Sequence, residues 1–410
     1  MENTSLGFHT ISIVKKLTQK EAKELLNDFY IYKEKTKEIR IFPIRNVKGT
    51  DNSDEFIKWL YSSSPQYYKV YYPNQSKGIL WLLRIAHKSP GFIKPGEDDR
   101  PCSIKVTINP KILASENNYL AAATAAYLDK VTSSFNIEAR KISPILGDYS
   151  QFSLNRPDYC INFDLKGMEI PCTAEQMVYL IKHGDIPKHY SERMEYNNIS
   201  KRKMSCKDSF YLESRSVTIN CYRKEAQLIK EFQQCPSLEA SQNIIRFEVQ
   251  CKYQKTYLLS KNIKDKQDIS EFDVISEMLS DDFCADIIRD YFYRIVRRGD
   301  YFTLDGAIRR VQSKSYKPKK EERLISELQR ISRFRGIHKV RAMLQGEELA
   351  TFRRTLNDLE EININPVTIP REWNIPRIPN LLYTYDKIVN AERCEMLLNE
   401  QRQELIHCFS

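Results

Sequence analysis

Glycine is scarce in this chain of 410 residues, with only 12 occurrences, and neither G-x-G-x-x-G nor G-x-x-x-x-G-K-[ST] is found. The backbone cradles that commonly bind dinucleotides or ATP phosphates are therefore not supported. No apolar run approaches the length of about 18 residues that a membrane helix needs. The first ten residues, MENTSLGFHT, lack the basic start and apolar stretch of a signal peptide. We therefore expect a cytoplasmic protein without a membrane partner.

The ten cysteines are scattered and form no C-x-x-C pair, so the ligand spacing of a zinc ribbon is missing. A chain without a secretory signal keeps its thiols reduced, and we expect these cysteines to serve as small buried hydrophobic residues. Hydrophobic residues make up 41% of the chain and charged residues 29%, which is the balance of a folded protein rather than of a disordered one. The length predicts two or three packed units.

The first 265 residues alternate between strand-like and helix-like patterns. Strands are expected at Thr10–Val14, Ile79–Ala86, Ser103–Asn109, Asp158–Leu165, Ser216–Tyr222 and Ile244–Cys251. Helices are expected at Thr18–Tyr30, Asn118–Phe135 and Thr173–His183, and both starting threonines are suited to cap a helix. This order predicts an α+β domain over residues 1–265, with a central antiparallel or mixed sheet and flanking helices.

From about Asp268 the pattern becomes helical. Apolar residues recur at helical spacing in three short units, 324–331, 340–344 and 349–359, which two glycines separate. This arrangement predicts a helix-turn-helix-like domain over residues 268–365. Four prolines between residues 366 and 379 predict an extended connector, and a final helix is expected from about Asp386 to His407. The connector and this helix form a third unit, residues 366–410.

Positive charge is concentrated in the helical part. Between Arg289 and Leu356, 18 Lys and Arg residues stand against 8 Asp and Glu, a balance that equals the net charge of +10 of the whole chain. Such a cluster is typical of a surface that binds phosphates, although a solvated helical face has the same composition. The third helical unit presents Arg353, Arg354 and Asn357 on its polar side, and these residue types contact phosphates and base edges. We therefore expect these three residues to bind DNA.

Aromatic residues are abundant, and four tyrosines lie between residues 67 and 72 with Lys69 among them. Such a stretch could stack unpaired bases. It is also typical of a half-buried strand, because aromatic residues favour sheets. We favour the strand.

Three of the expected strands carry chemically useful groups on one face. Because side chains alternate along a strand, residues of one parity share a face. The polar faces hold Arg156, Asp158, Cys160, Asn162 and Asp164; Thr218, Asn220 and Tyr222; and Arg246, Glu248 and Gln250. If these strands are neighbours, the carboxylates can bind Mg²⁺ or Mn²⁺, which offsets phosphate charge and assists phosphoryl transfer. The alternative is a solvent-facing surface held by cross-strand ion pairs.

The segment Ser209–Glu225 reads SFYLESRSVTINCYRKE, and Ile244–Lys252 reads IIRFEVQCK. Upstream, Asn155–Asp164 reads NRPDYCINFD. The three segments resemble the rolling-circle replication initiators of plasmids and phages, above all the staphylococcal-type plasmid initiators. That family has an aromatic-x-G-S-R-x-S strand, a Tyr-[Asp/Asn]-Lys element, an Arg-x-Glu strand and an upstream Arg-x-Asp-x-x-x-Asp strand. The similarity covers about one-seventh of the chain.

The resemblance implies a nickase-like first domain that cuts and rejoins one DNA strand at an origin. Tyr222 would attack a phosphodiester, giving a 5′-phosphotyrosine link and a free 3′-hydroxyl primer. Because transesterification keeps the energy of the bond, no ATP is needed. The implied partners are origin DNA, both duplex and single-stranded, and a host helicase and polymerase. A homodimer is compatible with the sequence.

The same matching assigns roles to the other residues. The implied ligands of Mg²⁺ or Mn²⁺ are Asp158, Asp164 and Glu248. Glu248 is also a candidate base. The further catalytic groups are Lys224 and Arg246, of which Arg246 would contact phosphate or orient the acids. The implied DNA contacts of this domain are Arg156 and Arg215.

The chain departs from the family pattern at several positions. Asn162 stands where a second aspartate is expected, with Asp164 two residues later, Glu213 replaces a glycine, and Arg223 precedes the lysine of the tyrosine element. No His-x-His pair exists, and we interpret His9 as a structural residue in preference to a metal ligand. Two other function classes stay open. One is a non-catalytic DNA-binding regulator of a plasmid or phage, and the other is a protein without a nucleic-acid role.

Overall fold

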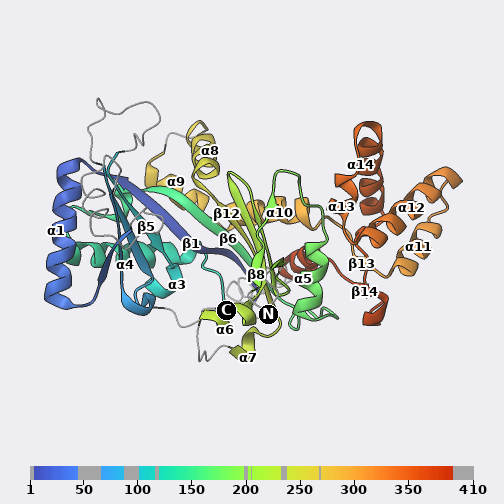
Figure 1. The fold of residues 1–410 in the computed structure, drawn as a ribbon, viewed down its shortest axis with the longest axis horizontal. Coiled ribbons are helices and arrows are strands. Elements are labelled where there is room, and N and C mark those ends of the chain that lie inside the picture. The colour runs from blue at the N-terminus through green and yellow to red at the C-terminus, as the bar shows by residue number, and fades with distance from the viewer. Residues whose placement is uncertain are drawn as a thin grey trace, which may run out of the picture.

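The computed structural model describes residues 4–44, 66–86, 101–115, 120–197, 202–204, 206–231, 238–266 and 269–390. Figure 1 shows an elongated molecule in which a large sheet occupies the left and centre, and a group of helices from α11 (Leu304–Gln312) to α14 (Gly346–Glu361) occupies the right end. In the part of the chain that is described, no helix is both long enough and apolar enough to cross a membrane.

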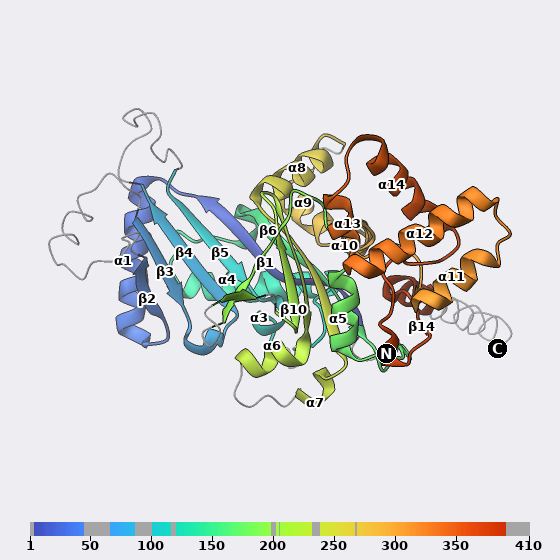
Figure 2. The same ribbon diagram turned by 45° about the vertical axis from the view of Figure 1, so that its right-hand side comes forward.

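Ten strands of the described residues form one antiparallel sheet. They are β1 (Ser5–Lys16), β2 (Arg40–Ile44), β3 (Gln66–Tyr71), β4 (Ile79–Ile85), β5 (Ser103–Ile108), β6 (Ser153–Asp164), β7 (Ser191–Glu192), β10 (Ser209–Glu213), β11 (Val217–Arg223) and β12 (Ile244–Cys251). Their order is β2-β3-β4-β5-β1-β6-β12-β11-β10-β7, and the broad left half of the sheet is seen in Figure 2. Two short strand pairs lie apart from it, β8 (Glu195–Asn197) with β9 (Arg202–Met204) and β13 (Tyr301–Phe302) with β14 (Arg377–Ile378).

The α+β class is confirmed, and all six expected strands form. The tyrosine-rich stretch is strand β3, as favoured above. The remaining helices of the sheet domain are α1 (Gln19–Thr36), α3 (Pro110–Leu113), α4 (Leu128–Ile142), α5 (Ala174–Lys182), α6 (Lys224–Glu231), α7 (Leu238–Ser241), α8 (Tyr253–Lys264), α9 (Glu271–Met278) and α10 (Asp281–Ile295). Both expected threonine caps are present, because Thr18 and Thr173 each form a capping box.

The helix expected at Asn118–Phe135 is displaced. Helix α4 begins only at Leu128 and continues to Ile142. Residues 120–124 instead run along β1, where Phe8 and Ala123 exchange two backbone hydrogen bonds of 2.8 and 2.9 Å. Residues 118 and 119 lie outside the described residues.

The expected domain boundary near residues 265–268 does not coincide with a change in packing. Helices α9 and α10 lie against the sheet, and the Phe292 ring of α10 stands 5.6 Å from that of Phe163 and 5.2 Å from that of Phe247. These phenylalanines belong to the main hydrophobic core together with the apolar faces of β6 and β12. The helices therefore complete the first domain because burial of apolar area holds them there.

The three helical units expected after residue 320 are confirmed as α12 (Pro318–Phe334), α13 (Ile337–Ala342) and α14. Leu324, Leu328 and Ile331 form the buried stripe of α12. Gly336 and Gly346 separate the helices with φ of +142° and +51°, values that favour glycine.

The stretch 366–379 is not an extended connector, because it is built into the helical region. Asp300 is 1% exposed and accepts hydrogen bonds from Arg377, Asn363 and the backbone N–H of Asn380. Strand β14, within the proline-rich stretch, pairs with β13. Residues 381–390 are helical, so the last described helix starts earlier than the expected Asp386, and its expected end at His407 lies outside the described residues.

A buried ion-pair cluster joins the helical region to the sheet domain. The carboxylate of Asp185, which follows α5 and is 3% exposed, accepts hydrogen bonds from Arg297 (2.9 Å) and Arg341. Arg297 also pairs with Glu360 of α14 at 2.8 Å. The main core continues from the sheet into α13 and α14. Buried charges and shared core together fix the basic helices relative to the sheet.

Candidate active site

The polar faces predicted on three separate strands form one continuous surface, because β11, β12 and β6 are neighbours and β1 lies beyond β6. The register aligns their side chains in three rows across the sheet. The rows are Tyr222–Arg246–Asn162–Ser5, Asn220–Glu248–Cys160–Gly7 and Thr218–Gln250–Asp158–Thr10. The tyrosine, the glutamate and the first aspartate of the sequence prediction thus occupy successive rows of one face.

This face is not the solvent-facing surface of the alternative interpretation. Other segments cover the end of the face at which Ile244 and Arg246 lie. Leu228 of α6 packs on Ile244 of β12. Residues 120–123 cross β1 so closely that a Cβ at Gly7 would lie 2.0 Å from the carbonyl oxygen of Ala123. Glycine is therefore required at that point. The covering segments therefore enclose this end of the polar sheet face.

Beyond the covered end, an open cavity of about 810 Å³ lies over Glu248 and Asp158. Its walls carry residues of the sheet together with Arg193 and Lys230 of other segments; the sheet residues include His9, Arg156, Asp158, Tyr211, Tyr222, Arg223, Glu248 and Gln250. Of the eighteen lining residues, four are Lys or Arg and three are Asp or Glu, so the cavity is polar with a balance of only +1, and a charged ligand is a more suitable occupant than an apolar one.

Tyr222 and Glu248 are joined diagonally across β11 and β12. The Tyr222 hydroxyl donates to Oε2 of Glu248 at 3.3 Å, and the other carboxylate oxygen, Oε1, accepts from Gln250 at 2.8 Å. Tyr222 is 8% exposed and Glu248 is 4% exposed. Burial raises the pKa of Tyr222 well above its usual value, Arg246 lowers this pKa, and the charge of Glu248 raises it. The phenol is therefore protonated at neutral pH and needs a base to become a nucleophile.

His9 is part of this site, although the sequence favoured a structural role for it over that of a metal ligand. The register of β1 against β6 slips between Phe8 and Thr10, so that His9 is the extra residue of a β-bulge. Its Nδ1 lies 3.8 Å from Oε2 of Glu248. Burial and then the charges of Arg246, Lys224 and Arg156 lower the pKa of His9 well below its usual value, so the imidazole is neutral. The bulge explains why an argument from strand parity could not find it.

Asp158 and Arg156 form a pair at the wall of the cavity. Arg156 donates from Nη2 to Oδ2 of Asp158 at 2.9 Å, and its Nε stands 2.9 Å from Oδ1. Burial raises the pKa of Asp158 to about 8, against the lowering effect of Arg156 and with a further raising effect from Glu248. The buried Asp158 carboxyl is therefore mostly protonated at neutral pH, and a cation bound beside it and Glu248 would favour its charged form.

Arg246 does not reach the cavity, which corrects its expected contact with phosphate. Its guanidinium is fully buried and donates to Oδ1 of Asn162 at 2.7 Å and to the carbonyl oxygen of Leu120 at 3.0 Å. Asn162 Nδ2 donates to the same carbonyl. Arg246 therefore holds the segment around Leu120 against the sheet, and its positive charge lies beside Tyr222.

Two further predicted residues lie away from the cavity. Asp164 is six residues beyond Asp158, which is about 20 Å along a strand, and its Oδ1 accepts from the backbone N–H of Gly167 in the following turn. Asp164 is therefore not a ligand at this site. Arg215 is exposed in the β10–β11 turn at the opposite end of the hairpin from Tyr222. Lys224, in contrast, is buried next to the site, where its Nζ donates to Gln227 at 2.7 Å.

The donor set suits a hard divalent cation, with fewer protein ligands than predicted. The described residues contain no group of three or more His, Cys, Asp or Glu side chains able to hold a metal ion. The 3.8 Å between His9 Nδ1 and Glu248 Oε2 is nevertheless a separation that two ligands of one ion can have, since metal–ligand distances are about 2.1 Å. Mg²⁺ in phosphoryl-transfer sites commonly takes one or two carboxylates and completes its shell with water and phosphate.

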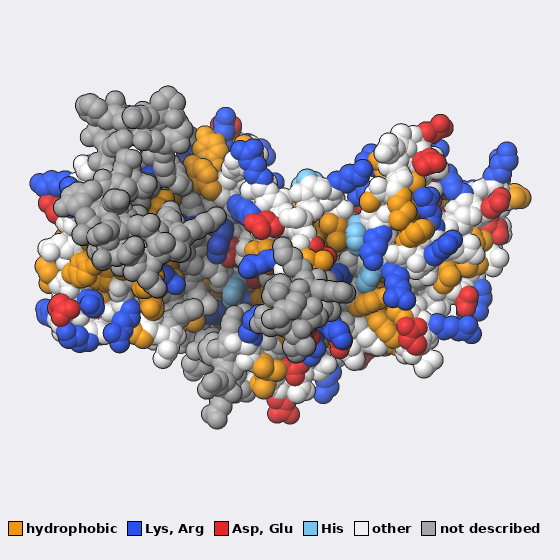
Figure 3. Space-filling view, in the orientation of Figure 1, with side chains coloured by type: hydrophobic (Ala, Val, Ile, Leu, Met, Phe, Trp, Pro, Cys, Tyr) orange, Lys and Arg blue, Asp and Glu red, His pale blue; other side chains and the backbone are white. Residues whose placement is uncertain are grey.

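Arg353, Arg354 and Asn357 are exposed on α14, as expected. Asn357 also accepts a hydrogen bond of 2.9 Å from Arg297. Figure 3 shows several Lys and Arg side chains gathered on the right end of the molecule, where the helical region lies. The basic cluster is therefore a surface feature, at a distance from the sheet cavity.

Comparison with known proteins adds little to this geometry. No family model and no curated protein matches the chain. Among solved structures, that of a rolling circle replication initiator protein from Geobacillus stearothermophilus is similar over 90% of this chain and 98% of its own, with 11% sequence identity and a TM-score of 0.32. A similarity at this TM-score does not establish function, and the proposals below rest on the site.

Proposed function

We propose that this protein is a rolling-circle replication initiator, which nicks and rejoins one DNA strand through Tyr222. The observation that carries the proposal is the contact of the Tyr222 phenol with the Glu248 carboxylate in the wall of a cavity lined by Arg156, Arg193 and Arg223. A phenol activated by a carboxylate and surrounded by guanidinium groups is suited to attack a phosphodiester. The resemblance of the three strand segments to initiators supports the same function.

In the proposed reaction Glu248 accepts the phenolic proton as the oxygen of Tyr222 attacks phosphorus. The bond from phosphorus to the 3′-oxygen breaks, and the proton held by Glu248 passes to that oxygen, which leaves a 3′-hydroxyl and a 5′-phosphotyrosine. Reversal of the step joins the strand. Arg246 stabilises the developing phenolate from within the sheet, and Arg156 contacts the phosphate at the cavity wall.

We further propose that Mg²⁺ or Mn²⁺ would be held by Glu248 and His9, with Asp158 as the third candidate ligand; in that case Glu248 would be a ligand of the ion instead of the base. When bound, the ion would polarise the scissile phosphate as a Lewis acid. Lys224 contributes positive charge beneath the site. Origin duplex would be bound by α14 through Arg353, Arg354 and Asn357, and a host helicase and polymerase would follow the nick.

A second candidate function is a non-catalytic DNA-binding protein of a plasmid or phage. The described residues contain no group of three or more metal-ligating side chains, which favours this second function. In that case the polar network would serve only to hold the sheet together. The basic surface of α14 is equally compatible with both functions.

A covalent-adduct assay separates the two. The supercoiled replicon that carries the gene is incubated with the full chain and Mg²⁺, and the products are run on a denaturing gel. We expect a protein–DNA adduct with the wild type, and none with Tyr222→Phe, which removes only the phenolic oxygen. Tyr211→Phe is the matched control, because Tyr211 lines the same cavity from β10. An adduct that survives Tyr222→Phe and disappears in Tyr211→Phe would assign the nucleophile to Tyr211.

A further inference from the structure

Helix α8 carries exposed aromatic and apolar side chains that the sheet site does not use. Tyr253, Tyr257 and Leu258 are 59%, 56% and 55% exposed, and together they are defined here as the α8 surface. The two tyrosines are one helical turn apart, and their ring centroids lie 6.2 Å from each other with an interplanar angle of 31°. In Figure 3 a hydrophobic patch bordered by basic side chains lies where Figure 1 places α8.

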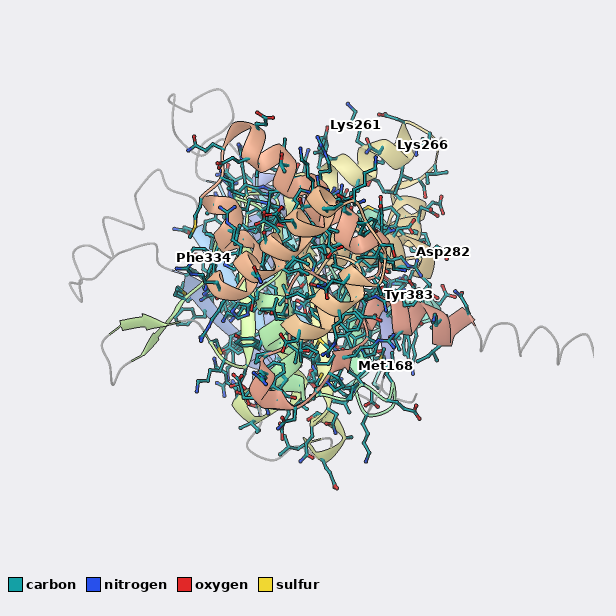
Figure 4. The ribbon with its side chains drawn as sticks, turned by 90° about the vertical axis from the view of Figure 1, so that its right-hand side faces the viewer. Met168, Lys261, Lys266, Asp282, Phe334 and Tyr383 are labelled. Carbon is teal, nitrogen blue, oxygen red and sulfur yellow. The ribbon has the colours of Figure 1, made fainter. Side chains whose placement is uncertain are left out.

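The segment that carries the α8 surface is basic, whereas the adjoining helix α9 contains Glu271, Asp273 and Glu277. The segment 252–266 has five lysines and only one acidic residue, Asp265. Two of the lysines pair with Glu213 and Glu271 of other segments, and three further lysines remain in the segment. Two of them, Lys261 and Lys266, lie at the upper edge of the molecule in Figure 4.

The composition of this patch indicates the chemical class of its ligand. Protein–protein interfaces are enriched in arginine and depleted in lysine, whereas all the cations of this segment are lysines. Exposed aromatic rings beside lysines provide faces on which unpaired bases stack and charges that follow the phosphates. A duplex keeps its bases stacked inside the helix, so it cannot use the two rings in this way.

Helix α8 follows β12 directly but packs with α9 on the apolar face of the sheet, whereas the cavity opens on the polar face. Gln250 lines the cavity, and α8 begins only three residues later, after Lys252. The row of Tyr222 and Arg246 lies six residues before Lys252 on β12, which is about 20 Å along the strand. A strand that leads from this patch to the cavity would therefore pass around the end of β12 where Lys252 lies.

We propose that the α8 surface binds single-stranded DNA leading to or from the cavity, with bases stacked on Tyr253 and Tyr257 and phosphates near the lysines of segment 252–266. The choice of single-stranded DNA as the ligand rests on the proposed function. The binding itself needs neither the metal ion nor the nucleophile.

The test measures equilibrium binding of the full chain to a fluorescent oligothymidylate of about 20 nucleotides, without divalent ions, and in parallel to a duplex of the same length. Three paired variants are compared at positions 253 and 257, namely Tyr→Ala, Tyr→Phe and Tyr→Leu. Tyr30→Ala is the matched control, because Tyr30 is a tyrosine with 41% exposure on α1, at the other end of the sheet.

We expect the alanine pair to weaken single-strand binding about 25-fold or more, since each stacked base contributes about fivefold at the least. The phenylalanine pair should bind like the wild type, because the ring does the stacking. The leucine pair should bind as weakly as the alanine pair, and duplex binding and Tyr30→Ala should be unchanged.

Wild-type affinity of the alanine pair would overturn the inference, as would a leucine pair that binds as tightly as the phenylalanine pair. An equal loss of duplex binding would also overturn it. These results are distinguishable from failure of the proposed function, which shows as a wild-type protein that forms no covalent adduct while it still binds the oligothymidylate.

Discussion

Replacing Arg246 with leucine tests whether the buried centre of the site holds the sheet and its cover together. The guanidinium donates two hydrogen bonds, to Asn162 and to the carbonyl oxygen of Leu120. Hydrogen bonds from a charged group contribute about 1.5–3 kcal/mol each. Leucine relieves the desolvation of the charge, and Asn162 still donates to Leu120, so one acceptor is orphaned rather than two. We therefore expect the free energy of unfolding to fall by about 3 kcal/mol.

Urea unfolding measures this loss. With a slope of about 3 kcal/mol per molar urea, the midpoint should fall by about 1 M while the slope stays constant. The urea midpoint of Arg246→Lys should lie between those of the wild type and Arg246→Leu. The reason is that an ammonium group keeps the charge but cannot donate to both acceptors as the planar guanidinium does. Arg215→Leu is the control, since this exposed arginine on the neighbouring hairpin should change stability by less than about 0.5 kcal/mol. Equal midpoints for Arg246→Leu and Arg215→Leu would refute the reasoning.

Three other outcomes follow from the site and the domain contacts. Glu248→Gln keeps the shape of the side chain but supplies neither a base nor a negative charge, so nicking should fall by about 10² or more with the melting temperature nearly unchanged; a large loss of melting temperature would indicate a structural role. The pair Arg353→Ala and Arg354→Ala should reduce the magnitude of the log–log salt slope of duplex binding by roughly one to two units, and Arg40→Ala on β2 should leave the slope unaltered. Asp185→Asn removes the anion that Arg297 and Arg341 share, while Arg297 keeps Glu360 as a partner, and it should lower the urea-unfolding free energy by about 3 kcal/mol; an unchanged midpoint would contradict this.

The strands were predictable because the alternation of apolar and polar residues follows directly from burial of one sheet face. The helix expected from residue 118 begins only at Leu128, because the residues before it lie against β1 through the bridge between Phe8 and Ala123, and a tertiary contact of this kind leaves no periodic signal. The packing of α9 and α10 on the sheet, across the boundary expected near residue 265, left no signal in the sequence for a similar reason. Helices α9 and α10 have the same local pattern as the basic helices, and only their packing against Phe163 and Phe247 assigns them to the sheet.

Parity also predicted the shared face of Tyr222, Glu248 and Asp158. It failed where the backbone departs from regular pleating. The bulge at His9 depends on the register of β1 against β6. Asp164 is on the expected face, but its pairing with Ile244 places it at the far end of β12 from the cavity. Arg246 was placed on the correct face, but its burial arises from the segment around Leu120, whose position no local pattern indicates.

The ion pairs of Asp185 and the shared core would give the proposed initiator a fixed distance between its two DNA-binding positions. Because α14 is fixed relative to the sheet, the spacing between a duplex bound on the basic helices and a strand cut at Tyr222 would be set by the protein and not by the DNA. Inserting about five base pairs between the two positions turns the scissile phosphate to the opposite side of the duplex, since B-DNA repeats every 10–10.5 base pairs. The cut would then keep its distance from the recognised sequence and shift to a different nucleotide, so the molecule would define the start of replication by length.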